Sequence, residues 1–126
     1  GMSSPAPLQV YDPAAISARL TGTLRHWRHQ DGCLVRTYRT GGWKGTLMVV
    51  NAIGHLAEAA WHHPEIRATY PAVEVRLDTH DAGGITDRDF ELAARIEDLV
   101  QWRPTTGGAL EGTPTEAPYL YIRYND

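Results

Sequence analysis

The sequence has only one cysteine and no long apolar run, and each scarcity excludes a class of protein. With Cys33 alone, the chain forms no intramolecular disulfide and cannot build a zinc site on thiolates, which favours a reducing cytoplasm. The apolar run at residues 47–50 falls far short of the roughly 20 residues that cross a bilayer. No basic N-terminal segment precedes an apolar stretch. We therefore expect a soluble, cytoplasmic protein with no membrane partner.

The charge balance gives little support to direct nucleic-acid binding. The chain has 12 basic and 15 acidic residues, a formal charge of −3, whereas surfaces that hold phosphates are usually basic. Residues 21–44 are an exception, because five basic residues and one acidic residue give +4 there and leave −7 for the rest. We interpret this segment as a solvated sheet face with alternating arginines. An anionic partner or substrate that docks near it remains an alternative.

The length and composition predict one globular domain with two irregular ends. The 126 residues are 42% hydrophobic and 21% charged, close to the averages for globular proteins. The first residues are rich in Ser, Pro and Ala without periodicity, and a Thr/Gly/Pro-rich stretch follows Pro104. We expect a flexible arm at 1–11, a domain at 12–103 and an extension at 104–126.

Hydrophobic periodicity predicts an α+β fold. Asp-Gly at 31–32 indicates a hairpin, and Pro64 indicates the end of the long central helix. Thr86, with a carboxylate three residues later, indicates the start of the last helix. The expected helices span 13–20, 43–61 and 87–102, and the expected strands 23–29, 33–39, 65–69 and 73–79. We predict a four-stranded antiparallel sheet with about three helices on one face and a possible extra edge strand at 119–124.

Ionisable side chains are densest where the central helix ends and after the clearest strand. This group consists of Glu58, His62, His63, His80 and Asp81, with Asp89 close behind. Glu58 and His62 share a helix face if the helix persists to its last turn, and His80 follows the strand at 73–79. Ends of neighbouring elements often converge at one rim of a sheet. Imidazoles there are suited to proton transfer near neutral pH.

Other interpretations of these residues remain open at this stage. Each histidine, taken alone, is explained by a capping or surface role. His55, Glu58 and His62 fall at i, i+3 and i+7, so they form a possible metal site with His80 as a fourth ligand. Cys33 has no evident partner base, which argues against a nucleophilic role.

Two motifs carry a resemblance to a known family. The first is Ala57-Glu58-Ala-Ala-Trp-His62-His63-Pro64, and the second is Thr79-His80-Asp-Ala-Gly-Gly-Ile-Thr86-Asp-Arg-Asp89. In combination and at this separation, they resemble the core signature of pterin-4a-carbinolamine dehydratases. The similarity covers about residues 12–102 and is strongest from Glu58 onward.

The resemblance implies an enzyme that dehydrates 4a-hydroxytetrahydrobiopterin to quinonoid dihydropterin and water without a metal or organic cofactor. It implies His62 and His80 as the acid/base pair, with Glu58 also in the catalytic group. The residues expected to bind the pterin are His63, Pro64, Thr79, Asp81 and Asp89. Members form homodimers or homotetramers, so we expect the same here.

The resemblance also carries an alternative of a different class. Some members act as non-catalytic partners: one stabilises the dimer of a homeodomain factor, and degenerate relatives assist Rubisco assembly. Those degenerate relatives have lost histidines of the motif, whereas this chain retains them. The chain departs from the family in its sparse phenylalanines and in its extension from residue 105, for which covering the pocket, adding a strand and mediating assembly are all open roles.

Overall fold

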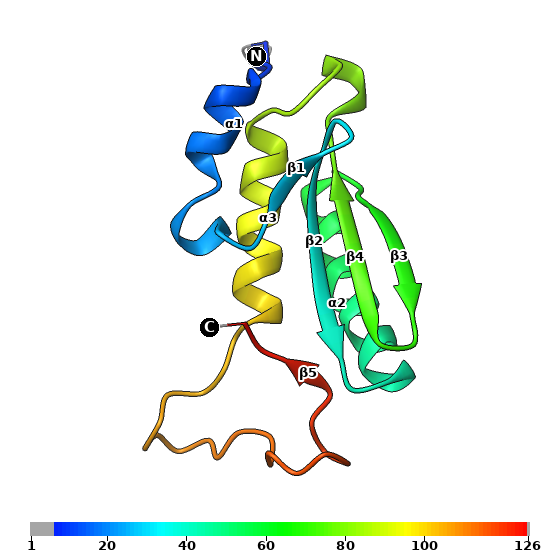
Figure 1. Ribbon diagram of the computed structural model, residues 1–126, viewed down its shortest axis with the longest axis vertical. Coiled ribbons are helices and arrows are strands. Elements are labelled where there is room, and N and C mark those ends of the chain that lie inside the picture. The colour runs from blue at the N-terminus through cyan, green and yellow to red at the C-terminus, as the bar shows by residue number, and fades with distance from the viewer. Residues whose placement is uncertain (1–6, 126) are drawn as a thin grey trace, which may run out of the picture.

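A computed structural model describes residues 7–125 and shows one antiparallel sheet backed by helices (Figure 1). The elements are α1 (Pro13–Arg19), β1 (Arg28–Gln30), β2 (Cys33–Thr40), α2 (Trp43–Ala60), β3 (Glu65–Thr69), β4 (Ala72–Leu77), α3 (Asp87–Val100) and β5 (Ile122–Arg123), with 3₁₀ helices at Gly22–Leu24 and His80–Ala82. The strand order is β1-β2-β4-β3, and β5 pairs with β2. The predicted α+β class is confirmed, including the added C-terminal strand.

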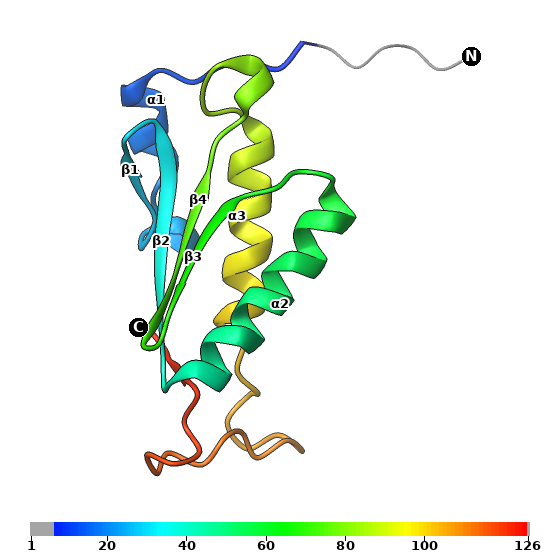
Figure 2. The ribbon, with the colours of Figure 1, turned by 90° about the vertical axis from the view of Figure 1, so that its right-hand side faces the viewer.

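The two long helices cover one face of the sheet, as the side view shows (Figure 2). In β4, alternate residues Val73, Val75 and Leu77 are fully buried on that face. In α2 and α3, Ile53, Phe90 and Ile96 belong to the same core. The period-2 and helical patterns of the sequence therefore meet in one apolar layer. The short helix α1 lies beside β1, at the edge of the sheet (Figure 1).

The strand expected at 23–29 is wrong over most of its length. Gly22–Leu24 forms a 3₁₀ helix, and β1 begins only at Arg28. The backbone N–H of Trp27 donates to the Leu24 carbonyl at 3.0 Å, and both side chains are buried. Two buried residues three apart indicate a turn of helix, whereas a strand alternates every second residue. The segment is rich in residues that favour strands, and this composition led to the wrong prediction despite the three-residue spacing of Leu24 and Trp27.

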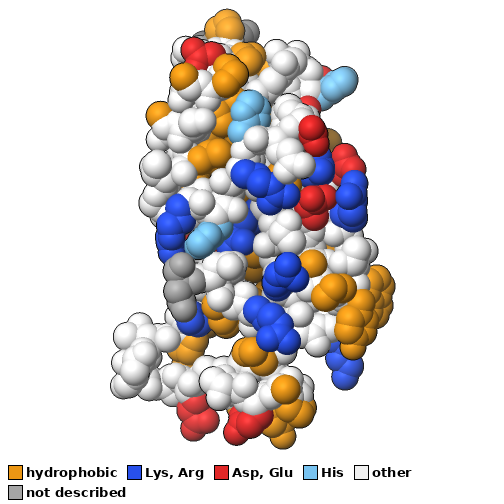
Figure 3. Space-filling model, viewed as in Figure 1, with side chains coloured by type: hydrophobic (Ala, Val, Ile, Leu, Met, Phe, Trp, Pro, Cys, Tyr) orange, Lys and Arg blue, Asp and Glu red, His pale blue; other side chains and the backbone are white. Residues whose placement is uncertain are grey.

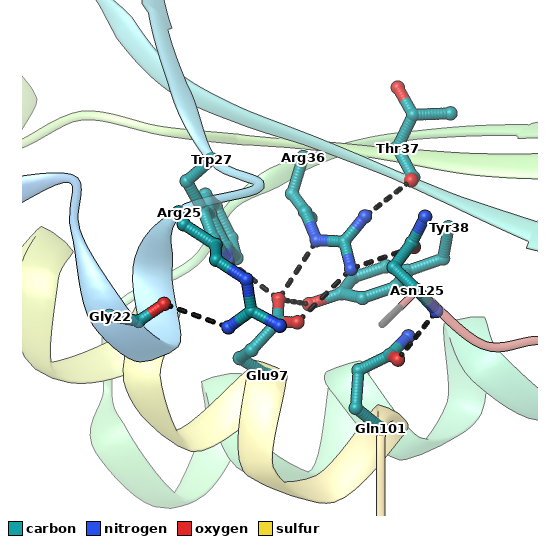
Figure 4. Close-up of polar contacts among 9 residues, drawn as sticks. All are labelled: Gly22, Arg25, Trp27, Arg36, Thr37, Tyr38, Glu97, Gln101 and Asn125. Carbon is teal, nitrogen blue, oxygen red and sulfur yellow. Dashed lines mark hydrogen bonds and ion pairs between the residues drawn. The ribbon is translucent and has the colours of Figure 1, made fainter.

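A buried acidic residue joins the last turns of α3 to the sheet (Figure 4). One carboxylate oxygen of Glu97, Oε1, accepts from Trp27 Nε1 at 2.9 Å, Arg36 Nε at 2.8 Å and Tyr38 OH at 2.8 Å. Its other oxygen accepts from the Arg36 NH2 group at 3.0 Å. Arg36 is only 3% exposed, so the interpretation of residues 21–44 as a solvated arginine face does not hold for it. It faces α3 and is paired there.

This network shifts the ionisation of its members. Burial alone would raise the pKa of Glu97, but the hydrogen bonds from Arg36, Tyr38 and Trp27, with the Arg36 charge, outweigh burial and hold the pKa below its ordinary value. Burial and the neighbouring Glu97 raise the pKa of Tyr38. Glu97 is therefore an anion and Tyr38 a hydrogen-bond donor at neutral pH.

The other face of the sheet has arginines that surround one acidic residue. Arg28, Arg67 and Arg76 lie 3.7, 3.6 and 3.2 Å from the Glu74 carboxylate. Basic side chains are spread across this face, with acidic ones among them (Figure 3). Val35, which pairs with Arg28 and Arg76, is fully buried although it lies on the same face. Long arginine side chains cover such apolar residues while their charged ends reach water.

The C-terminal extension returns to the sheet. Ile122 is 3% exposed, and β5 pairs with Arg39 and Thr40 at the end of β2, on the edge that β1 occupies further along. The tail passes so close to the first turn of α2 that a Cβ on Gly45 would collide with the Tyr121 carbonyl oxygen. Glycine is therefore required there by close approach of the backbone.

Part of the expected N-terminal arm is described, and residues 1–6 of it lie outside the described residues. The Tyr11 backbone N–H donates to the Ile85 carbonyl at 2.9 Å, and its hydroxyl donates to Asp87. Its ring meets the Phe90 ring edge to face, with centroids 5.0 Å apart. These contacts place Tyr11 against the start of α3.

Candidate functional site

The central helix ends just before the paired histidines. Its last residue is Ala60, and Trp61 adopts a left-handed conformation with φ of 51°. The His62 backbone N–H then donates to the Ala57 carbonyl at 3.1 Å, the pattern of a Schellman helix end. His62 is therefore outside the helix, and the expected helical face shared by Glu58 and His62 does not form.

His62 instead contacts an aspartate in the first turn of α3. Its Nε2 lies 2.7 Å from Asp89 Oδ1; the His62 side chain is 12% exposed, and the Asp89 side chain is completely buried. A carboxylate only accepts hydrogen bonds, so His62 Nε2 carries the hydrogen. In the neutral ring this leaves Nδ1 as the basic nitrogen. Such a pair orients an imidazole for proton transfer.

The second carboxylate oxygen of Asp89 also accepts hydrogen bonds. Asp89 Oδ2 accepts from the Thr79 hydroxyl at 2.8 Å and from the Thr86 backbone N–H at 2.9 Å. The Thr79 proton is used on Asp89, so the Thr86 hydroxyl donates to Thr79 Oγ1, 2.7 Å away. Thr86 and Asp89 also form the capping box of α3. The aspartate that contacts His62 is thus itself held by the start of α3 and by Thr79, two residues after the end of β4.

The second histidine has a different partner. His63 Nε2 lies 2.7 Å from Glu58 Oε1, and both side chains are well exposed. The Trp61 ring packs edge to face against the His63 ring, with centroids 5.0 Å apart. Each histidine of the pair therefore has its own carboxylate, one buried and one at the surface.

The remaining candidates lie on neighbouring loops. His80 and Asp81 are exposed in the 3₁₀ helix His80–Ala82, directly after Thr79, and Pro64 is half-buried before β3. Within residues 7–125, His80 forms no hydrogen bond or ion pair with the other candidates. The structure thus joins His62, Asp89 and Thr79 directly and His63 to Glu58. His80 is linked to the first group only through the chain.

A cavity of about 680 Å³ lies between α2 and α3 and includes His62 in its wall. Its lining contains neither His63 nor His80, and consists of Leu56, Ala59, Ala60, His62, Arg88, Glu91, Leu92, Ala94 and Arg95. Sequence reasoning missed the contribution of α3. The signal was present, since Arg88, Glu91 and Arg95 recur at helical spacing next to the buried stripe of that helix.

The alternative metal set is not assembled. Within the described chain, no group of three or more His, Cys, Asp or Glu side chains is placed to hold a metal ion.

The Cys33 thiol is half-buried, and burial raises its pKa, which disfavours the reactive thiolate. In the same residues, no helix is long and apolar enough to span a membrane.

Comparisons with known proteins agree on one family. Residues 9–99 match the family model described as pterin 4 alpha carbinolamine dehydratase. A protein of Aquifex aeolicus named "putative pterin-4-alpha-carbinolamine dehydratase" is 46% identical over 78 residues, 62% of this chain and 79% of its own.

Two solved structures share the fold. One, from Brucella melitensis, is described as a transcriptional coactivator/pterin dehydratase; it has a TM-score of 0.63 and 22% identity, over 72% of this chain and 98% of its own. The other is described as a pterin dehydratase-like RuBisCO assembly factor in the alpha-carboxysome, with a TM-score of 0.51 and 25% identity, over 62% of this chain and 93% of its own.

Proposed function

The chain belongs to the pterin 4 alpha carbinolamine dehydratase family, and on that premise we propose that it dehydrates 4a-hydroxytetrahydrobiopterin to quinonoid dihydropterin and water. In this reaction the C4a–O bond breaks and its electron pair leaves on the oxygen. An acid protonates that oxygen, and the product is water. A base removes the N5 proton, and the N–H electron pair becomes the N5=C4a double bond. The chemistry thus requires one proton donor and one proton acceptor near the ring.

The observation that carries the proposal is the His62–Asp89 pair. A buried carboxylate with both oxygens occupied holds one imidazole nitrogen at 2.7 Å, which fixes the orientation of the ring and supports its protonated form during transfer. His62 also borders the cavity between α2 and α3, whose apolar wall includes Leu56 and Leu92. A flat bicyclic ring fits such a wall, with its polar edge toward the histidine.

His80 is proposed as the second member of the acid/base pair. It follows Thr79, which donates to Asp89, so the Asp89 network fixes the start of the His80 turn. His63 and its Glu58 partner are proposed to bind and orient the pterin at the exposed side, beside Pro64 and Asp81. The pH profiles of the single His62 and His80 variants identify the imidazole that protonates the leaving oxygen.

The test is turnover of 4a-carbinolamine, followed by ultraviolet absorbance against the spontaneous reaction. We expect wild-type protein to accelerate dehydration. His62→Ala and His80→Ala should each lower kcat by about 100-fold, at the lower end of what one positioned acid or base contributes. His29→Ala, an exposed histidine on β1, is the matched control and should keep wild-type turnover. Wild-type turnover at the spontaneous rate, or full activity of both site variants, contradicts the proposal.

A second candidate is a non-catalytic assembly partner on the same scaffold. It is favoured by the likeness to the protein described as a RuBisCO assembly factor. The retained His62, His63 and His80 favour the enzyme. The two functions separate in the turnover assay, because an assembly partner gives no acceleration at any protein concentration.

A further inference from the structure

Trp61 is unusual for a tryptophan in both its backbone conformation and its exposure. Its φ of 51° lies in the left-handed region, where a helix end ordinarily places glycine or asparagine. A bulky residue is strained there, because its Cβ crowds the neighbouring carbonyl oxygen. The side chain is 75% exposed, the highest value among the large apolar side chains of residues 7–125. Burial in the core therefore does not compensate the strain, and strain of this kind is typical of functional sites.

The neighbours of Trp61 belong to the candidate site. Ala60 and His62, on either side of it in the chain, both line the cavity between α2 and α3. The next residue, His63, places its ring at 82° to the indole, with the ring centroids 5.0 Å apart. The backbone of Trp61 is therefore at the rim of the cavity, and its indole lies beside the histidine proposed to bind the pterin.

The contact with His63 leaves part of the indole surface free. A T-shaped contact uses the edge of one ring and a face of the other, so at least one face of the indole has no ring against it. The imidazole has a second contact of its own, because His63 Nε2 lies 2.7 Å from Glu58 Oε1. An exposed indole face beside a positioned imidazole is suited to stacking on a flat heterocycle.

We propose that Trp61 binds the pterin by stacking its indole on the bicyclic ring. This inference rests on the proposed function, which supplies the pterin as the ligand. The indole covers one face of the bicyclic ring, and the perpendicular His63 ring limits how far the pterin can slide. Trp61 thus selects for a flat ring system and takes no part in proton transfer, which stays with the imidazoles.

The test is the binding of biopterin to the full chain, measured by isothermal titration calorimetry. Biopterin is stable and lacks the 4a-hydroxyl group, so it binds without reacting. Trp61→Gly should weaken binding about tenfold or more, as expected for the loss of one stacked aromatic ring. Trp61→Phe retains a smaller aromatic face and should weaken binding by less than about fivefold.

Thermal unfolding of Trp61→Gly separates this role from a structural one. Glycine adopts the left-handed conformation without strain, so the unfolding midpoint should stay at the wild-type value or rise while the affinity for biopterin falls. If the indole served mainly to hold the helix end through its contact with His63, the midpoint would fall instead. A lower midpoint therefore overturns the proposal.

Trp43→Ala is the matched control, because Trp43 is an exposed tryptophan at the other end of α2, about 25 Å away at the helical rise. Its affinity for biopterin should stay within about twofold of wild type. Unchanged affinity in Trp61→Gly, or equal weakening in the Gly and Phe variants, overturns the stacking role and leaves the proposed reaction intact. Absence of binding to the wild-type protein also overturns it, and the turnover assay decides separately whether the chain is a dehydratase.

Discussion

His62 Nε2 lies 2.7 Å from Asp89 Oδ1, a contact between residues 27 positions apart. It joins the end of α2 to the first turn of α3, and the same aspartate closes the capping box of α3. The start of one helix and the orientation of the imidazole thus depend on one carboxylate. A change at Asp89 acts on both, so its test needs a control variant that affects the helix start alone.

Asp89→Asn is expected to lower kcat about 100-fold and to change KM little. The amide can present its NH₂ group to His62, which favours the wrong tautomer of the imidazole. Steady-state kinetics measures the two effects. Asp87→Asn removes a negative charge from the same first turn of α3 but leaves the contact between His62 and Asp89 in place. It therefore controls for the effect of the lost charge on helix stability. A variant with wild-type kcat would remove Asp89 from the proposed positioning role.

Glu58→Gln is expected to raise KM several-fold with kcat nearly unchanged. Glu58 contacts His63, which we propose binds the pterin, and does not contact His62. Because both side chains are exposed, the free energy of unfolding should change by less than about 1 kcal/mol. A large fall in kcat with constant KM would instead place Glu58 among the proton-transfer groups.

Glu97→Gln is expected to destabilise the fold by about 3–5 kcal/mol at neutral pH, because it leaves the buried Arg36 charge uncompensated. The pKa of Glu97 is lowered in the folded protein, so its stabilising contribution is present above the ordinary glutamate pKa of about 4.3 and is lost as pH falls through the lower folded value. Denaturant unfolding from pH 7 to pH 3 should show the gap between wild type and variant narrowing.

Glu111→Gln, on the exposed part of the extension, is the control for that measurement. It should follow the wild-type stability curve throughout. A constant gap between wild type and Glu97→Gln at all pH values would contradict the lowered pKa of Glu97.

Gly45→Ala and Gly54→Ala are expected to change stability in opposite directions, although both lie in α2. A Cβ at Gly54 meets nothing within 4 Å, so alanine should stabilise the helix by about 0.5–1 kcal/mol. A Cβ at Gly45 collides with the Tyr121 carbonyl and must displace the tail from β2. Thermal unfolding measures both, and amide exchange at Ile122 reports tail detachment. Stabilisation by both substitutions would show that the tail does not press on α2.

Much of the fold could be predicted because its signals are local. The alternation at 73–77, the helical stripe of α3 and its Thr86 cap each depend on residues within a few positions, where backbone geometry sets the period. The strand expected at 23–29 failed for the opposite reason. Whether Leu24 and Trp27 belong to a strand or a turn depends on the core that they enter, which includes Phe90 and Ile96.

The candidate site divides in the same way. The two histidine motifs were visible in the sequence, and so was the helix end before Pro64. Their partners were not, because a left-handed Trp61 rotates His62 away from Glu58 and toward Asp89. The backbone angles of Trp61 determine which carboxylate His62 meets, and the spacing of residues along the chain does not predict those angles.

Local signals in the sequence were enough to place the long helices and the central strands, with histidines near their ends, because periodicity, capping and proline act over one or two turns. The pairing of the charged side chains depends instead on how the chain folds in three dimensions. The Arg36–Glu97 pair spans 61 positions, and Asn125 reaches Gln101 across 24. Such contacts form when the core brings distant segments together and removes their water, so their partners are chosen by packing and by the energy of leaving a buried charge or donor unpaired.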